Sequence, residues 1–512
     1  MSKVNLDALI VREDFEASDV RDYGKKKDTA SIEDMKSDSF FFSNLRKPDF
    51  QRETNEWDSQ KIASLVKSFI DGDLIPSIIL WRNSAGYLFV IDGSHRLSAL
   101  AAWINNDYGD GEQSKKFYDG LIPEEQISAA NEARRLVEKN VGSYSDCKLA
   151  LTHPDKVRPE IVQYAKNLGA LSVQLQWVEG DAAKAENSFF KINQQAAPID
   201  KTELRLLKER TKPFSIAARA IIRSGKGHKY WSRFTNTVQA EIQSNAKDIN
   251  AILFAPSLKT PIRTLELPLA GKLYSAATLP LIVDMIGIVS SNQNKDDESG
   301  EETILVLKEV KTAAQKINSS HPGSLGLHPA IYFYSQEGRH KNSSFLAITD
   351  FVKRLETKAH KDRFIRVRPA FESFLVNYDY VLQQINRKYR IAQASYPHIS
   401  KLLSLMIEKL DQGKDIPEAV AETQTNPEFG FLTLNNQEIR SENTGRKFNR
   451  DDKSSIFLKD VLEKSSKCPI CGGALHMNSI SFDHKTPRRD GGSDSSDNGQ
   501  TTHPYCNTGY KS

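Results

Sequence analysis

The sequence has few cysteines and no long apolar run. Four cysteines in 512 residues are too few for the disulfide framework of a small secreted domain. The best candidate for a membrane span, residues 273–283, is interrupted by Pro280 and flanked by Lys272 and Asp284. The segment MSKVNLDALIVREDFEA has charged residues where a secretory signal needs an apolar core. We therefore expect a soluble, cytoplasmic protein without a membrane partner.

The sequence also lacks a large excess of charge of either sign. It has 70 basic and 66 acidic residues and a net charge of +4. This balance does not require a nucleic-acid partner, and it does not exclude a local basic groove. We find no internal repeat. A chain of 512 residues exceeds one ordinary core, so we expect two or three domains.

Residues 1–210 are predicted to form an α/β domain. The stretch WDSQKIASLVKSFIDG has the apolar spacing of a helix that ends at Gly72. Two short apolar runs, PSIILW and YLFVID, are separated by Asn-Ser-Ala-Gly and indicate a β-hairpin. Helical spacing resumes in HRLSALAAWI, which places Asp92, Gly93 and Ser94 at a turn between a strand and a helix.

The rest of the chain is predicted to contain a mostly helical domain (residues 211–410), a linker (411–453) and a compact tail (454–512). The basic, aromatic stretch of residues 360–374 either lines a DNA-binding surface or is the solvated face of a helical bundle, and the second interpretation is favoured. A solvated loop is expected at residues 290–302. Helices are expected at 200–223, 303–318, 345–360, 369–393 and 397–411.

The tail contains two pairs of potential metal ligands with the same spacing. Cys468-Pro-Ile-Cys471 and His503-Pro-Tyr-Cys506 together supply the four ligands of a tetrahedral zinc site. The tail has few apolar residues, so a zinc ion would supply folding free energy that a small core cannot. His476 is an alternative fourth ligand.

The residues around these ligands follow a characteristic order. They are Asp483-His484, Pro487, Gly491-Gly492, Asn498, Asn507 and Lys511. This order resembles the HNH (ββα-metal) endonucleases. The resemblance implies a small zinc-stapled ββα-metal domain that hydrolyses phosphodiester bonds.

The HNH resemblance also implies roles for individual residues. His484 would be the general base that takes a proton from the attacking water. Asp483 and Asn507 would bind one catalytic Mg²⁺ or Mn²⁺, and Asn498 would hold the loop or orient His484. Four basic residues either grip DNA phosphates or belong to an ordinary solvated face: Lys485, Arg488, Arg489 and Lys511.

The N-terminal region carries a second set of separated motifs. These are Phe50-Gln51-Arg52, Trp57-Asp58, Ile75-Pro76, Asp92-Gly93-Ser94-His95-Arg96 and AENSFFKINQQAAPIDKTELRLL at 185–207. Together they resemble the ParB/sulfiredoxin-like domain of GmrSD- and SspE-type defence proteins.

That resemblance implies nucleoside triphosphate binding, often with hydrolysis. Backbone N–H groups after Gly93 would face an anion. Arg52 and Arg96 would close on phosphate oxygens, and Asp92 would hold a metal or a water. In the alternative interpretation, Asp92 caps the helix and Arg96 pairs with a carboxylate. The full predicted set is Gln51, Arg52, Asp92, Gly93, Ser94, His95 and Arg96.

The sequence thus predicts a multidomain α+β protein and three functional hypotheses. The first is a metal-dependent DNA endonuclease that makes one nick per active site, is regulated by a nucleoside triphosphate and acts in restriction-like defence on phage DNA, modified or not. The second is a DNA-binding sensor with a purely structural zinc module. The third is a working N-terminal NTPase whose tail only anchors DNA. The sequence leaves open whether the chain forms a homo-oligomer.

Overall fold

The computed structural model describes most of the chain and separates into two compact units. The described residues are 3–13, 25–48, 57–118, 120–195, 201–226, 230–273, 275, 277–291, 295–434 and 447–511. The first unit comprises residues 1–210 with 226–230, and the second comprises 211–225 with 231–512. Among the described residues, no helix is both long enough and apolar enough to cross a membrane.

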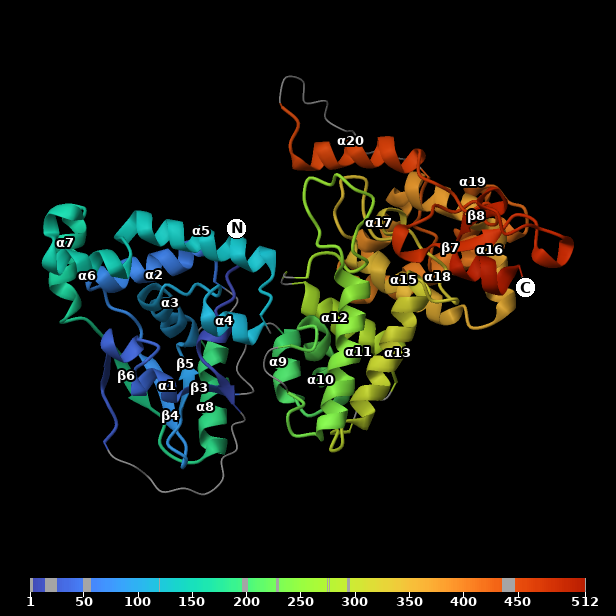
Figure 1. Ribbon diagram of the computed structural model, residues 1–512. Helices are drawn as coiled ribbons and strands as arrows, with labels where there is room; N and C mark the ends of the chain where they lie inside the picture. The colour runs from blue at the N-terminus through green and yellow to red at the C-terminus, as the bar shows by residue number, and fades with distance from the viewer. Residues whose placement is uncertain are drawn as a thin grey trace. The chain divides into compact units, whose positions relative to one another are not determined.

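A mixed six-stranded sheet forms the centre of the first unit (Figure 1). Its strands, in the order β1-β3-β5-β4-β6-β2, are β1 (Arg12–Glu13), β3 (Leu45–Pro48), β5 (Leu88–Asp92), β4 (Ile78–Arg82), β6 (Ser172–Trp177) and β2 (Thr29–Ser31). Strand β5 lies between β3, which is parallel to it, and β4, which is antiparallel. The predicted hairpin is therefore confirmed as β4–β5, and the carboxyl ends of β3 and β5 lie at the same edge of the sheet.

Both faces of this sheet are buried because apolar side chains alternate along β5. Leu88 and Val90 belong to the larger core on one face, whereas Phe89 and Ile91 belong to a smaller core on the other. Helices α2 (Ser59–Asp71), α3 (Ser94–Asn105), α5 (Glu124–Val141), α6 (Tyr144–Thr152) and α7 (Pro159–Leu168) contribute to the larger core. Helices α8 (Ala182–Gln195) and α9 (Lys201–Lys208) contribute to the smaller one. The two remaining helices of this unit are α1 (Phe40–Asn44) and α4 (Glu112–Phe117).

Helix α2 begins and ends where the sequence predicts. The Asp58 side chain accepts a hydrogen bond from the backbone N–H of Lys61 at 2.9 Å and caps the first turn. Gly72 ends the helix in a left-handed conformation with φ of +77°. The predicted helix is therefore confirmed.

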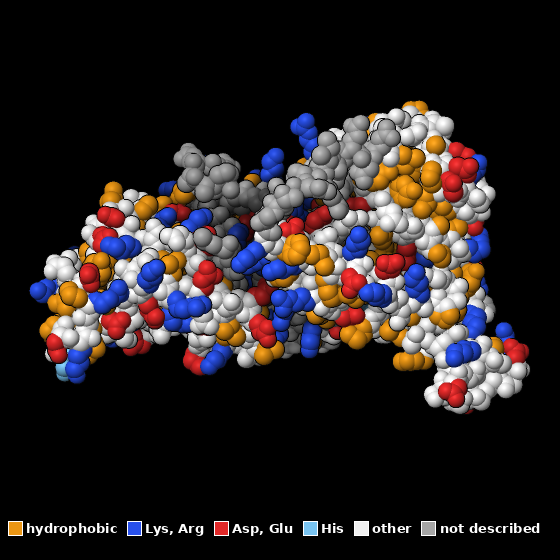
Figure 2. All heavy atoms as spheres, turned by 90° about the horizontal axis from the view of Figure 1, so that it is seen from above, with side chains coloured by type: hydrophobic (Ala, Val, Ile, Leu, Met, Phe, Trp, Pro, Cys, Tyr) orange, Lys and Arg blue, Asp and Glu red, His pale blue; other side chains and the backbone are white. Residues whose placement is uncertain are grey.

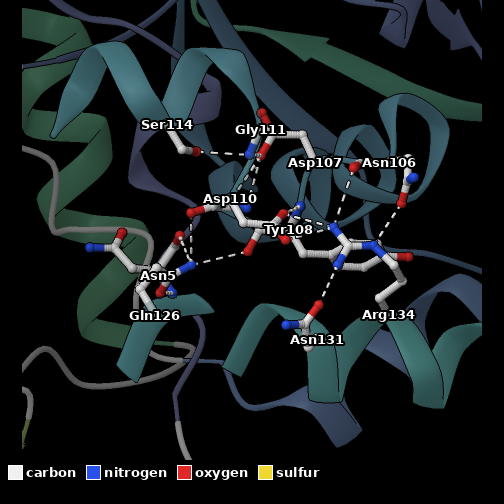
Figure 3. A network of polar contacts seen from close by, with 11 residues as sticks. Asn5, Asn106, Asp107, Tyr108, Asp110, Gly111, Ser114, Gln126, Asn131 and Arg134 are labelled. Carbon is white, nitrogen blue, oxygen red and sulfur yellow. Dashed lines mark hydrogen bonds and ion pairs between the residues drawn. The ribbon is translucent and has the colours of Figure 1, made fainter. Parts of the chain in front are cut away.

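A buried carboxylate organises the loop between α3 and α4 (Figure 3). Oδ1 of Asp107 accepts hydrogen bonds from the three backbone N–H groups of residues 109–111, at 3.0, 3.1 and 2.9 Å. Arg134 on α5 binds both carboxylate oxygens of Asp110 at 2.7 and 2.8 Å. Gln126 donates to backbone carbonyl groups of the same loop at 3.1 and 3.2 Å. The loop is thus fixed to α5 by polar contacts.

We predict that Asp107→Ala destabilises the first unit by about 2 to 4 kcal/mol, because it leaves several buried N–H groups without an acceptor. Differential scanning calorimetry of the full chain should show a lower melting temperature. Glu112→Ala is the matched control, since that carboxylate is exposed and pairs only with Lys115 at the surface. Equal melting temperatures for the two variants would show that the Asp107 carboxylate does not stabilise the loop.

The second unit is mostly helical and ends in a small hairpin module. Its helices are α10 (Pro213–Ile222), α11 (Asn236–Phe254), α12 (Thr278–Val289), α13 (Glu301–Ile317), α14 (Pro329–Tyr332), α15 (Asn342–Arg354), α16 (Lys358–Asn377), α17 (Asp379–Tyr389), α18 (Ala392–Asp411), α19 (Ile416–Thr423) and α20 (Arg450–Glu463). Strands β7 (Ser481–His484) and β8 (Gly499–Thr502) form the hairpin, which lies close to α16 (Figure 1).

Three predicted helices differ from the structure at a proline, two within this unit and one that begins in the first unit. Helix α16 continues through Pro369 and α18 continues through Pro397, although the sequence analysis placed helix starts at both. Apolar residues are buried on both sides of Pro369 and in the turns that follow Pro397, and this burial outweighs the local cost of about 3 kcal/mol for an interior proline. Conversely, the helix predicted at 200–223 is two helices, and Pro213 opens the second.

The segment predicted as a linker contains ordered structure in its described part. Helix α19 lies within it, and Phe429 and Leu432 are buried. Residues 435–446 lie outside the described residues.

Candidate metal centre and active site

Four buried side chains of the C-terminal module converge on one point. The ligand atoms of Cys468, Cys471, His503 and Cys506 all lie within 4.8 Å of one another. Cys471 Sγ is 3.2 Å and Cys506 Sγ is 3.9 Å from Nδ1 of His503. Three thiols and one imidazole are the donor set that zinc prefers in structural sites, so the residues fit the predicted ion.

The pKa values of the imidazole and of one thiol are lowered, whereas hydrogen bonding to Cys468 raises the pKa values of Cys471 and Cys506. His503 Nε2 lies 3.1 Å from the carbonyl oxygen of Ala474, which can only accept, so Nε2 carries the proton and Nδ1 faces the thiols. Burial and the nearby Arg368 guanidinium lower the pKa of His503, which keeps the ring neutral. The neighbouring thiols of Cys471 and Cys506 lower the pKa of Cys468. Burial instead raises the pKa of Cys147, in the other unit, to about 11.

The alternative ligand, His476, does not belong to this cluster. Its ring is buried, with Nδ1 3.2 Å from Asn318 Oδ1 and Nε2 3.1 Å from Glu266 Oε2. Burial lowers its pKa to about 4. His476 thus packs against the helical part of the unit, while His503 occupies the fourth position.

The register of the hairpin places the predicted catalytic residues on two faces of β7. Asp483 pairs with Gln500, and His484 pairs with Gly499. Side chains alternate along a strand, so Asp483 points to one face, and Phe482 and His484 point to the other. The Asp483 side chain is 10% exposed and Phe482 is 82% exposed.

Asp483 is held as a carboxylate. Lys511 Nζ lies 2.7 Å and Gln500 Nε2 lies 3.0 Å from its Oδ2 atom. Burial alone would raise the pKa of Asp483, but these two donors outweigh it and hold the pKa below its usual value. Lys511 also donates to the carbonyl group of His484 at 2.9 Å, which fixes the end of the strand.

Asn507 follows the last cysteine on a short π-helix, Cys506–Tyr510. Its Nδ2 group donates to Ser481 Oγ at 2.8 Å and to the carbonyl group of Phe482 at 3.1 Å. The amide nitrogen is therefore turned toward β7, and the amide oxygen is left as a hard ligand. A carboxylate and an amide oxygen fit a Mg²⁺ or Mn²⁺ ion.

His484 contacts a carboxylate that the sequence analysis missed. Its Nε2 atom lies 3.0 Å from Asp494 Oδ1, which also accepts from Arg488 Nε at 2.7 Å. The Arg488 guanidinium and the His484 ring lower the pKa of Asp494. Because the ionised carboxylate accepts only, it favours the tautomer with the proton on Nε2 and leaves Nδ1 of His484 free to accept a proton.

Asn498 holds the loop between β7 and β8. Its Oδ1 atom accepts from the N–H group of Thr486 at 2.9 Å. Its Nδ2 group donates to the carbonyl groups of Thr486 and Ser493 at 3.0 and 2.7 Å. Of the two roles predicted for Asn498, this geometry corresponds to holding the loop, and Asp494 is the residue that contacts the ring of His484.

Several basic side chains near the module are already engaged within the chain. Lys485 donates to the carbonyl group of Asp497 at 2.8 Å, and the mostly exposed Arg489 lies 3.9 Å from a carboxylate oxygen of Asp490. In the stretch 360–374, Arg363 and Arg366 both pair with Asp411. On the face that Figure 2 shows, Lys and Arg side chains mix with Asp and Glu side chains and do not gather in one basic patch.

The predicted phosphate turn of the first unit lies at the carboxyl end of β5. Gly93 has φ of +94° and begins α3 without a side-chain cap. Arg96 Nη2 lies 2.5 Å from Asp92 Oδ2 and donates to the carbonyl group of Ser77 at 3.1 Å. The pairing of Arg96 with a carboxylate matches the alternative interpretation, whereas Asp92 does not cap the helix.

The remaining residues of that predicted set differ in how far they are described. Ser94 is buried at the start of α3. His95 is also buried and stacks on Trp57 with 5.7 Å between ring centroids. Gln51 and Arg52 lie outside the described residues.

Residues 468–512, in the C-terminal module, match the HNH endonuclease family. Residues 32–208 match the N-terminal domain of the GmrSD restriction endonuclease family. No curated protein and no solved structure matches the chain. The chain therefore joins a GmrSD-type N-terminal domain to a C-terminal HNH endonuclease domain, and the predicted family resemblance and α+β class are confirmed. The two domains support a nuclease in restriction-like defence, for which DNA is the implied substrate.

The sequence analysis missed four residues that contact the site. Asp494 and Gln500 lie in the polar tail without a motif that marks them. Arg368 lies in the basic stretch considered as a DNA-binding surface, yet its side chain is fully buried beside His503. Glu372 lies one helical turn after Arg368 and pairs with it at 2.7 Å. The i, i+4 spacing of opposite charges was the only signal for this pair, and it did not reveal the partner.

We predict that the purified chain contains one zinc ion and that Cys468→Ser loses it, because an alcohol is a poor zinc ligand. Elemental analysis of the full-length protein measures this directly. Cys147→Ser is the matched control, since this buried cysteine belongs to the other unit. Loss of zinc from both variants, or from neither, would contradict the assigned ligand set.

Proposed function

We propose that the chain is a metal-dependent DNA endonuclease that cuts one strand per active site. We further propose that a nucleoside triphosphate bound by the N-terminal domain regulates it in restriction-like defence against phage DNA. The observation that carries the nuclease proposal is that Asp483 and His484 are adjacent on β7 and that Asn507 donates to Ser481 and to the carbonyl group of Phe482 on the same strand. An ion held by the Cys₃His cluster would join the segments before and after the hairpin.

The proposed reaction is hydrolysis of a phosphodiester bond. Nδ1 of His484 accepts a proton from the attacking water, while Asp494 at Nε2 orients the ring and stabilises the imidazolium that forms. A cation bound by Asp483 and Asn507 would stabilise charge on the scissile phosphate and the leaving oxygen. Lys511 keeps Asp483 ionised and adds positive charge beside it. A purely structural zinc module would require none of these five side chains, so this set favours an enzyme over a sensor.

The geometry of the turn between β5 and α3 supports the proposal that a nucleotide regulates the enzyme. The first turn of α3 has no side-chain cap, so its N–H groups can bind phosphate oxygens. Arg96 and Asp92 lie at this turn, and the Arg96 guanidinium could exchange its partner for a phosphate. The neighbouring strand β3 ends at the same edge of the sheet, and Gln51 and Arg52 follow it in the sequence.

We predict that His484→Ala reduces nicking of supercoiled plasmid in the presence of Mg²⁺ by at least about 100-fold, because the water loses its base. Agarose gels that separate nicked from supercoiled plasmid measure the rate. His153→Ala, at an exposed histidine of the first unit, is the control. Zinc content equal to that of the parent protein would show that the variant keeps its fold, and parental nicking by such a variant would exclude His484 as the base.

We predict that Asp92→Ala and Arg96→Ala weaken nucleotide binding and lower any nucleotide turnover. Isothermal titration calorimetry with ATP and GTP measures binding, and phosphate release measures turnover. Asp71→Ala is the matched control, because Asp71 also belongs to an i, i+4 pair with a basic residue but lies on α2. Unchanged binding in both turn variants would assign the Asp92–Arg96 pair to structure alone.

A further inference from the structure

A charged side chain from the helical part of the second unit reaches the metal centre. Arg368 lies in the middle of α16, and its side chain is 0% exposed. Its guanidinium donates to the carbonyl oxygens of Leu325 at 2.6 Å and Gly326 at 2.9 Å. Nη1 also lies 3.2 Å from Nδ1 of His503, the ring nitrogen that faces the thiols. A fully buried arginine is rare unless its charge is compensated.

The hydrogen bonds around Arg368 form a closed ring across two parts of the chain. Arg368 Nε binds Glu372 Oε1 at 2.7 Å, and the second oxygen of Glu372 accepts from the N–H group of Ala474 at 3.0 Å. The carbonyl group of Ala474 binds His503 Nε2 at 3.1 Å, and His503 Nδ1 faces Arg368 again. Glu372 of α16 thus holds Ala474, whose carbonyl group fixes the tautomer of a metal ligand, and Arg368 lies against the same ring.

The absence of a side chain at Gly473 in the metal-binding loop leaves space for the Arg368 guanidinium. A Cβ atom on Gly473 would lie 2.2 Å from Arg368 Nε, so any other residue at position 473 would displace the guanidinium. Gly473 directly follows the turn in which the N–H group of Gly472 bonds to the carbonyl group of Cys468 at 2.8 Å. The close approach of α16 is thus built into the first ligand pair.

Electrostatics gives the arginine a role beyond packing. A divalent ion held by three thiolates and a neutral imidazole carries one net negative charge, and this centre is buried. Burying a net charge is costly unless an opposite charge lies close by. When Nδ1 of His503 is a metal ligand it no longer accepts from Arg368, but Leu325, Gly326 and Glu372 still hold the guanidinium beside the centre.

We propose that Arg368, held by Glu372, is a positioning residue of the Cys₃His centre, so that the helical region completes the metal site of the nuclease module. This inference rests on the proposed zinc site but not on the proposed cutting reaction. Further contacts between the nuclease module and the helical region are consistent with this positioning role. Tyr505 donates its hydroxyl to Asp362 at 2.9 Å and its N–H group to the carbonyl of Ser324 at 3.0 Å.

The test compares two arginines on one helix in the full-length protein. We expect Arg368→Met to release zinc to a chromogenic chelator about tenfold faster or more, because a partner of the metal ligands is lost. Arg368→Lys should retain zinc better than Arg368→Met does, because lysine keeps the positive charge. It lacks the planar guanidinium group, so its zinc retention should stay below that of the parent protein. Arg366→Met is the control, because Arg366 is half exposed and pairs with Asp411 at the surface.

Cobalt substitution provides a readout that a purely structural role would not change. Without the nearby cation the thiolate electrons are less stabilised, so the sulfur-to-cobalt charge-transfer band of Arg368→Met should move to longer wavelength. The band of Arg366→Met should match that of the parent. If Arg368→Met does not fold, Glu372→Gln is measured in its place and should also release zinc faster than the parent.

The outcomes separate this inference from the proposed function. Parental release rates and spectra in the Arg368 or Glu372 variants would overturn the positioning role. Absence of zinc from the parent protein would overturn it together with the metal centre. If the parent protein retains zinc normally but does not nick DNA, the proposed endonuclease activity would be contradicted. The positioning role of Arg368 would not be affected.

Discussion

The C-terminal module depends on the convergence of three thiols and one imidazole from two short segments. Cys468 and Cys471 lie before the hairpin, and His503 and Cys506 lie after it, so one ion held by them would join both ends of the module. Few apolar side chains are buried in this module, so this bond network would replace a core. It also sets the geometry of the proposed active site, because Asn507 is the residue after the last ligand and Asp483 lies on the strand that Asn507 contacts.

The module is not separate from the helices that precede it. Arg368 and Glu372 bring two buried, opposite charges to the metal centre, and Gly473 leaves the room that the arginine needs. Such a buried pair stabilises the fold only when all its polar atoms find partners, as they do here through backbone carbonyls, an N–H group and a tyrosine hydroxyl. A movement of α16 would therefore change the hydrogen bonds that link Arg368 and Glu372 to the metal-ligand segments. This provides a physical route by which events in the helical region could reach the nuclease module.

In the N-terminal domain, the residues of the proposed nucleotide site also form contacts with each other. Its sheet is covered on both faces, and the turn after β5 is fixed by the left-handed Gly93. At that turn the side chains of Asp92 and Arg96 bind each other. Both side chains are partly buried, with 19% of Arg96 and 30% of Asp92 exposed, and a phosphate could take the place of the carboxylate at the guanidinium. The proposed nucleotide site would then replace an internal ion pair with a ligand.

The features that depend on local spacing could be predicted from the sequence. Two ligand pairs with equal spacing, an Asp-His pair and a glycine turn between a strand and a helix were all recognisable, because each is set within a few residues. The continuation of helices through Pro369 and Pro397 was not recognisable, since it depends on apolar residues of each helix that are buried by tertiary packing. His503 was already the predicted fourth ligand, and the structure excludes the alternative, His476. The contact of Asp494 with His484 and the burial of Arg368 at the metal centre emerge from tertiary structure alone. These contacts join residues brought together by folding, and no pattern along the chain records which distant partner a charged side chain meets.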